Sequence, residues 1–281
     1  MKKVLLASTI LVGTAGFAAA DTANFSFSGA ASFGFAYSNL AGGTGTPTVS
    51  SEFTAAMSST TDGGLNFGSS ITVSSASRGM DDDNTTTTFG TVTTSGSSIS
   101  DANAYVSGDW GKFSVSYDAN VAGITTDDNV TFAYSNTWGD FTVDAAYSWM
   151  PGAGNDTASL GGTYSMGAYS VYATLNMDEV GGWGLDNIDF GGSASMSGFS
   201  AGVDANYDLV TKDLTWKATA GYGTGAWSLG VFVEDDDTLN GVDFGANGSY
   251  DLGGGMNISA ALIRDNDLKL YVAEASVGMS F

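Results

Sequence analysis

The chain has 281 residues, including forty glycines and two prolines but no cysteine and no histidine, and its formal net charge is −22. Without cysteine and histidine it can have no disulfide framework, no Ser–His or Cys–His nucleophile and no histidine-ligated zinc site. Charged residues make up 14% of the chain, against about 25% in typical soluble domains. The strong acidity argues against nucleic acid as a partner and favours cations.

The first twenty residues have the pattern of an export signal. A basic start at Lys2 and Lys3 precedes a short apolar run over 4–12, and Ala18–Ala20 are small residues suited to cleavage. The run is too short for a membrane-spanning helix, which needs about 20 residues, and no later segment supplies one. We therefore expect a signal peptide over 1–20. The mature domain then covers 21–281, where thirty acidic residues outnumber six basic ones.

Beyond residue 21, apolar and polar residues alternate with a period of two, which indicates β-strands with one apolar and one polar face. Phe199, Val203 and Tyr207 share one face, for example, and Asp204 and Asp208 share the other. The apolar faces carry no charge, as lipid contact requires, because a charge at the bilayer midplane costs about 2–4 kcal/mol. In chain order, strands are predicted over 23–37, 52–60, 65–75, 100–108, 112–118, 129–137, 140–149, 157–166, 168–177, 187–197, 199–208, 213–223, 226–234, 241–251, 255–264 and 268–281.

The connections between these strands alternate between tight and long. The tight ones contain glycine, as in Trp138-Gly139-Asp140, because glycine supplies the positive φ of short hairpins. The long ones are predicted over 38–51, 76–99, 119–127, 150–155, 178–187, 209–212, 235–240 and 265–267. This alternation predicts an all-β fold, a transmembrane up-and-down antiparallel β-barrel of sixteen strands, or of fourteen if 76–108 is misread. A large soluble β-sandwich or β-helix is the alternative, since either would also alternate.

The C-terminal segment alternates apolar and polar residues from Tyr271 to Phe281. A last strand of this kind that finishes on phenylalanine resembles the signal read by the outer-membrane assembly machinery. We therefore expect the barrel-assembly machinery as a partner, Tyr271 and Phe281 as the assembly signal, and the outer membrane of a Gram-negative bacterium as the location.

Two stretches resemble a known family. Residues 53–73, FTAAMSSTTDGGLNFGSSITV, and residues 249–259, SYDLGGGMNIS, are similar to hairpins of the Gram-negative general porins of the alphaproteobacterial (Rhodobacter) type. The resemblance implies a sixteen-stranded barrel, a homotrimer, surrounding outer-membrane lipid and lipopolysaccharide, and passive diffusion of small hydrophilic solutes.

The chain departs from that family at its third long connection. Family members fold a long loop into the lumen there, whereas residues 119–127 form a connection of about nine residues. No residue of the family's constriction is therefore transferred to this chain. The longest connection, 76–99, could fold inward instead, or it could be a solvated external loop.

Charged residues on the predicted polar faces are the candidate channel lining. A selective channel needs such charges at its narrowing, and their acidic excess predicts a preference for cations. The alternative is that they are hydrated lumen surface without a narrowing. The predicted pore-lining residues are Asp118, Asp144, Asp178, Asp189, Asp204, Asp208, Glu234, Asp243, Glu274, Lys112 and Lys217.

Two acidic loop clusters are weak candidates for Ca²⁺, which favours several carboxylate oxygens. They are Asp81, Asp82 and Asp83, and Asp235, Asp236 and Asp237. Neither cluster has EF-hand spacing, and the alternative is that both are solvated acidic loops. No cofactor other than this possible loop-bound Ca²⁺ is expected. A plugged structural or adhesive barrel whose loops bind partners is the alternative function. An enzyme is disfavoured because histidine and cysteine are absent.

Overall fold

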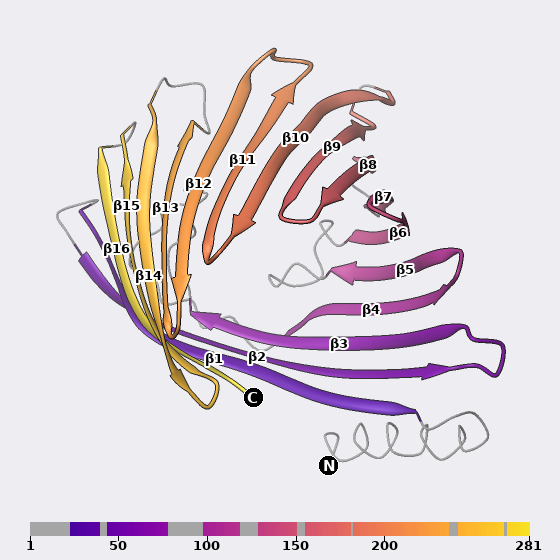
Figure 1. Cartoon of the computed structure of the whole chain (residues 1–281), viewed down its shortest axis with the longest axis horizontal. Helices are drawn as coiled ribbons and strands as arrows, with labels where there is room; N and C mark the ends of the chain where they lie inside the picture. The colour runs from indigo at the N-terminus through magenta and orange to yellow at the C-terminus, as the bar shows by residue number, and fades with distance from the viewer. Residues whose placement is uncertain are drawn as a thin grey trace.

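The computed structural model describes residues 23–39, 44–77, 98–118, 129–150, 155–180, 182–235, 241–266 and 269–281. Their strands form one closed barrel in which each strand pairs antiparallel with its neighbours in sequence, and β1 pairs with β16 (Figure 1). Among these residues there is no long apolar helix of the kind that spans a membrane. The strands are β1 (Asn24–Ser38), β2 (Thr44–Thr60), β3 (Asn66–Ser77), β4 (Ser98–Gly108), β5 (Gly111–Asp118), β6 (Asn129–Trp138), β7 (Phe141–Trp149), β8 (Thr157–Met166), β9 (Tyr169–Asp178), β10 (Gly184–Met196), β11 (Phe199–Asp208), β12 (Leu214–Thr224), β13 (Trp227–Asp235), β14 (Asp243–Gly253), β15 (Met256–Asp265) and β16 (Leu270–Ser280).

The predicted sixteen-stranded barrel is confirmed, and fourteen strands and a sandwich are both excluded. Strand ends agree with the prediction to within three residues except at the start of β2. There the predicted loop over 38–51 is wrong, because Thr44 onward pairs with β1. At Pro47, β2 has a described partner on one side, β1. On its other side, the register with β3 begins two residues later, at Val49. A proline is tolerated in such a stretch because its missing N–H removes no ladder bond.

The seam between β1 and β16 is hydrogen-bonded at both ends. At the end that carries the tight turns, Gly29 N donates to Phe281 O at 2.8 Å and Phe281 N donates to Gly29 O at 3.0 Å. At the end that carries the long loops, Tyr271 N donates to Asn39 Oδ1 at 2.7 Å. Closure removes the sheet edges, which lipid could not satisfy with hydrogen bonds. These two ends of the barrel are named the turn end and the loop end below.

Glycine makes the turn end tight. Gly139 follows Trp138 with φ 61°, and Gly198 joins β10 to β11 with φ 86°. A Cβ on Gly198 would lie 2.5 Å from the carbonyl oxygen of Gly223, near the end of β12. Glycine is therefore required at position 198 both by its backbone conformation and by the close approach of the next hairpin.

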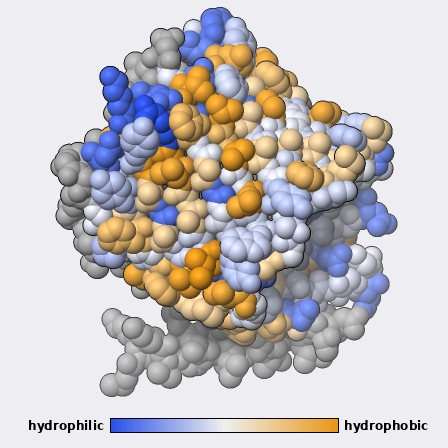
Figure 2. Space-filling model, turned by 60° about the vertical axis from the view of Figure 1, so that its left-hand side comes forward, coloured by the Kyte–Doolittle hydropathy of each residue, from blue (hydrophilic) through white to orange (hydrophobic). Residues whose placement is uncertain are grey.

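The exposed large apolar side chains of the described strands lie on the outside of the barrel. Phe27 is 67% exposed and Phe199 is 62% exposed, whereas Ala36 and Leu270 are the buried hydrophobic residues of the described chain. Figure 2 shows apolar side chains spread over the outer wall, with strongly hydrophilic ones gathered at its edge. An apolar surface of this extent requires lipid rather than water around it.

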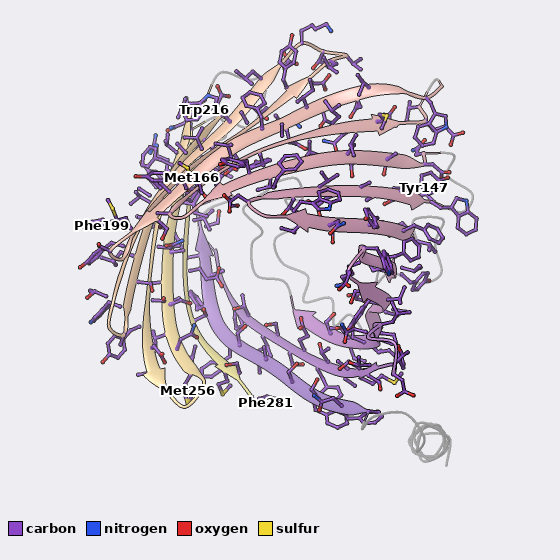
Figure 3. The ribbon with its side chains drawn as sticks, turned by 45° about the vertical axis from the view of Figure 1, so that its right-hand side comes forward. Tyr147, Met166, Phe199, Trp216, Met256 and Phe281 are labelled. Atoms are coloured by element: carbon purple, nitrogen blue, oxygen red, sulfur yellow. The ribbon has the colours of Figure 1, made fainter. Side chains whose placement is uncertain are left out.

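Aromatic side chains mark the two margins of the outer wall. Tyr147, near the loop end, and Phe199, near the turn end, lie at opposite margins of the barrel (Figure 3). On the described strands, the charges of the outer face are confined to the loop end, at Asp235 and Arg264. Arg264 lies 4.5 Å from the Tyr271 ring and donates to Asn266 at 2.6 Å. A cation at the membrane margin can reach the polar interface in this way.

Candidate channel lumen

The predicted pore-lining residues lie on the face opposite the apolar one. Residues opposed in neighbouring strands share a face of the sheet, and one such row joins Asp204, Lys217, Glu234 and Asp243. The register places all eleven on this face: Asp118, Asp144, Asp178, Asp189, Asp204, Asp208, Glu234, Asp243, Glu274, Lys112 and Lys217.

This face points into the barrel. A cavity of about 820 Å³ is lined by Ser32 and Ser50 from β1 and β2 and by Ser228 and Ser249 from β13 and β14. These strands, together with β15 and β16 between them, form one continuous arc of the ring. An arc of six strands can line a single hollow only on its concave, inner side. The polar face is therefore the lumen wall, and the part its charges play in ion passage stays a prediction.

Four further carboxylates face the lumen that sequence reasoning did not select. They are Glu52, Asp101, Asp251 and Asp265. Glu52 and Asp251 stand at the ends of predicted strands, and Asp265 lies just beyond one, where the alternation is weakest as a signal. On the described strands, the nine predicted carboxylates and these four share the lumen with two lysines.

Six of these carboxylates form an acidic rim at the loop end. Each stands within two residues of the end of its strand, and the six are Asp118, Asp178, Asp208, Glu234, Asp243 and Asp265. Asp118 is directly opposite Asp101, and Glu234 is directly opposite Asp243. Like charges in opposed positions destabilise an antiparallel pair. The rim therefore brings like charges close together and concentrates negative charge at one mouth of the barrel.

An amide network fixes the carboxylate of Asp189 on the wall. Asn176 Nδ2 donates to one carboxylate oxygen at 2.6 Å, and Asn206 Nδ2 donates to the other at 2.6 Å. Both amides also donate to Asn187 Oδ1, at 2.7 and 3.0 Å. Hydrogen bonds to an ionised acceptor are stronger than those between neutral groups. Asp189 is thus a charge of fixed position on the lumen wall.

A tyrosine and a glycine position the carboxylate of Asp204. Tyr172 on β9 donates its hydroxyl to Asp204 Oδ1 on β11 at 2.7 Å, across the intervening strand β10. The intervening residue is Gly191, and a Cβ there would lie 2.7 Å from the Tyr172 ring and 2.8 Å from Asp204 Oδ1. The contact between β9 and β11 therefore depends on glycine at position 191.

Both lumen-facing lysines are held against the wall by aromatic rings. Lys217 Nζ lies 2.8 Å from Glu234 Oε2 and 4.6 Å from the centre of the Phe232 ring. Lys112 Nζ lies 4.7 Å from the centre of the Tyr105 ring. The face of an aromatic ring attracts a cation, so these two positive charges are drawn to the wall rather than extended into the lumen.

Hydroxyl pairs cover much of the neutral lumen wall. Ser32 and Ser50 are 2.7 Å apart, and Ser259 and Ser276 are also 2.7 Å apart. Each pair joins opposed residues of two neighbouring strands. Hydroxyl groups can donate and accept at the same time, so this part of the wall can exchange hydrogen bonds with water and polar solutes.

The remaining predicted residues fall in three places. Asp235 ends β13 on the outer face, opposite Trp216, and the described residues contain no cluster of ligating side chains able to hold a metal. Tyr271 and Phe281 lie on the outer side at opposite ends of the seam, 45% and 78% exposed. The other candidates, Asp81, Asp82, Asp83, Asp236 and Asp237, lie outside the described residues, as do the third connection and most of the loop over 76–99.

Solved structures with the same fold are porins. Three engineered variants of the porin of Rhodopseudomonas blastica superpose with TM-scores of 0.72, 0.72 and 0.69, at sequence identities of 13, 14 and 14%. Each match covers 92% of this chain and 100% of the porin chain. At such identity the likeness shows the fold alone.

The sequence comparisons then give the family. The curated proteins contain no match to this chain. A family profile described as Gram-negative porin matches residues 7–269, which confirms the family resemblance found in the sequence. This protein belongs to the Gram-negative porins, which are non-enzymatic channels of the outer membrane.

Proposed function

We propose that this porin passes small hydrophilic solutes and ions by passive diffusion and prefers cations to anions. The observation that carries the preference is the imbalance of charge on the lumen wall. Nine predicted and four further carboxylates share the described wall with Lys112 and Lys217, and both lysines are held by aromatic rings. A sixteen-stranded barrel has room for water inside it.

Simple electrostatics supports the direction of the preference. At 0.1 M salt, charges act over about 10 Å before ions screen them. A cation in the lumen therefore interacts with several wall carboxylates at once. Lys217 is paired with Glu234, so its positive charge is largely neutralised and contributes little repulsion to a cation in the lumen. The accumulation of cations at the acidic rim should be largest at low salt.

The reversal potential of the refolded protein in a planar bilayer tests the preference. In a tenfold KCl gradient, a cation-preferring channel makes the dilute side positive. The triple variant Asp118→Asn, Asp178→Asn, Asp208→Asn should reduce that potential, because it removes three charges of the rim. The matched control is Asp62→Asn, Asp109→Asn, Asp140→Asn, which removes three charges from turns at the other end. A negative dilute side in the unchanged protein would overturn the proposal.

The proposal extends to the mature form and its surroundings. Residues 1–20 are removed as a signal peptide, and 21–281 form a homotrimer in outer-membrane lipid and lipopolysaccharide. The barrel-assembly machinery recognises the strand from Tyr271 to Phe281. N-terminal sequencing of the outer-membrane form should begin at Asp21, and native mass spectrometry should give three chains. A start at Met1 or a single chain would contradict the corresponding part.

A further inference from the structure

One part of the lumen wall is apolar, although the rest is polar. In the register, Phe232 on β13 is opposite Gly245 on β14, Gly245 is opposite Ile263 on β15, and Ile263 is opposite Val272 on β16. These residues form one continuous row across four strands. A Cβ on Gly245 would overlap the Phe232 ring, so glycine lets the ring lie flat along the row. A barrel whose inside faces water needs no such side chains.

Acidic residues border this apolar row on both sides. Towards the loop end, Glu234, Asp243 and Asp265 are each no more than 9% exposed. Towards the turn end stands Glu274, two residues beyond Val272 on the same face of β16. Four residues of strand separate the row of Asp265 from that of Glu274, or about 13 Å along the chain.

The row and its acidic borders line a single cavity. Its volume is about 570 Å³, and the described residues that line it include Phe232, Ile263, Val272, Glu234 and Glu274. Sites for small organic molecules have about 300–1,000 Å³, apolar walls and a few charged groups that fix orientation. This cavity has those properties inside a channel that otherwise offers hydroxyls, amides and carboxylates.

The protein's own lysine indicates the chemistry that fits. The side chain of Lys217 is an alkylammonium ion, and its Nζ lies 4.6 Å from the Phe232 ring centre and 2.8 Å from Glu234. The same surroundings therefore already hold an aliphatic amine of this chain. The cavity is lined by four carboxylates and one lysine, so its net charge is negative and complementary to a further cation. Asp243 also accepts a hydrogen bond from Asn266 N at 2.7 Å, which fixes the position of its carboxylate.

We propose that this cavity binds aliphatic diamines, with one ammonium group at the border of Asp243 and Asp265, the methylene chain on Ile263 and Val272, and the second ammonium group at Glu274. An eight-carbon chain spans roughly the distance between the two acidic borders. The two ammonium groups pair with the carboxylates at both borders. The apolar row removes the methylene chain between them from water, which favours binding. The cavity is thereby a specific binding site in the wall of a channel through which other solutes diffuse without binding.

The test is block of the current through the refolded full chain in planar bilayers. Octane-1,8-diamine is compared with Mg²⁺, which has the charge without the aliphatic chain, and with octane-1,8-diol, which has the chain without the charge. The diamine should block with an apparent dissociation constant at least tenfold lower than that of Mg²⁺, and the diol should not block. Equal block by the diamine and Mg²⁺ would overturn the proposal.

Variants separate the cavity from the general charge of the lumen. The double variant Ile263→Thr, Val272→Thr keeps β-branched side chains and so preserves the strands. It should weaken diamine block about tenfold, because roughly 50 Å² of apolar contact is lost. Glu274→Gln should weaken it ~5-fold. Asp144→Asn removes an equal charge from the wall outside this cavity and should change it less than twofold. Unchanged block in the double variant would contradict the site.

Calorimetric titration of the detergent-solubilised protein measures diamine binding without any current. Heat that saturates in the unchanged protein and falls in the double variant supports the site, even if reversal potentials show no cation preference. Saturating heat that is the same in both proteins refutes it. The cavity and the cation preference of the channel are thus tested separately.

Discussion

Two adjacent alanines test the assignment of the two faces of the wall. Ala145 and Ala146 lie in the middle of β7, where Ala145 is opposite Tyr134 and Leu160 on the outer face. Ala146 is opposite Ala133 and Ser159 on the lumen face. Lysine at position 145 should meet lipid and lysine at position 146 should meet water. The two variants have the same composition and differ only in the face that receives the charge.

The expected magnitude follows from the depth of Ala145. Four residues separate it from each end of β7, which is about 13 Å of strand, or roughly 10 Å of height at a tilt near 40°. The apolar band of an outer-membrane barrel is about 25 Å tall. Position 145 is therefore close to the midplane, where lysine costs about 2–4 kcal/mol. Ala146→Lys should change the free energy of unfolding by less than about 0.5 kcal/mol.

Urea unfolding in lipid vesicles, followed by tryptophan fluorescence, measures this difference by linear extrapolation. Ala145→Lys should lower the free energy of unfolding by about 2–4 kcal/mol, and Ala146→Lys should leave it near that of the unchanged protein. Equal losses in the two variants, or a larger loss for Ala146→Lys, would refute the face assignment and with it the lumen described above.

Three further predictions concern single contacts. Gly191→Ala should destabilise the barrel by about 1–3 kcal/mol, because its Cβ would lie 2.6 Å from the carbonyl oxygen of Val203 and 2.7 Å from the Tyr172 ring. Adding Tyr172→Ser should restore only part of that loss in the same urea assay, because the contact with the Val203 carbonyl remains, and a full recovery would contradict the backbone clash. Asn176→Leu, Asn206→Leu should free the Asp189 carboxylate from its amide donors and broaden its carboxylate infrared band, whereas an unchanged band would show that the amides do not fix it. The Asp156 carboxylate accepts hydrogen bonds from the Tyr147 hydroxyl and the Met150 N–H, which lower the pKa of the Asp156 carboxyl below its ordinary 3.8. This loop contact should therefore be fully present above pH 4 and be lost as the pH falls through the lowered pKa. The fluorescence of Trp183, whose ring centre lies 6.2 Å from that of Tyr147, should report the loss, and an identical acid transition in Asp156→Asn would refute this prediction.

The strands could be predicted because lipid enforces alternation on every one of them. Where another constraint replaces it, the prediction shifts. β10 has a register irregularity between Leu185 and Asn187, so the alternation slips and the predicted strand starts late. β2 starts early because the segment around Gly45 and Pro47 pairs with β1. The Phe35 ring covers Gly45 so closely that a Cβ there would overlap it, a packing requirement that no local pattern reveals.

Parity along a strand indicates the face of a residue but not its height on the barrel. That Asp204 and Glu234 lie on the same side follows from alternation alone. That Lys217 stands between them follows from the register of β11, β12 and β13. The apolar row from Phe232 to Val272 likewise depends on three registers, which the lengths of the turns and the packing of whole strands decide. Alternation therefore predicts the face on which a residue lies, and the register of the strands decides which residues are its neighbours.

The most direct test of the account is the reversal potential of the unchanged protein in tenfold KCl gradients at two ionic strengths. The screening length is about 30 Å at 0.01 M and about 3 Å at 1 M. If wall carboxylates attract cations, the dilute side should be clearly positive in the gradient from 0.01 to 0.1 M. That potential should then decline between 0.1 and 1 M. A potential near zero or negative on the dilute side at both ionic strengths would contradict a cation-preferring lumen.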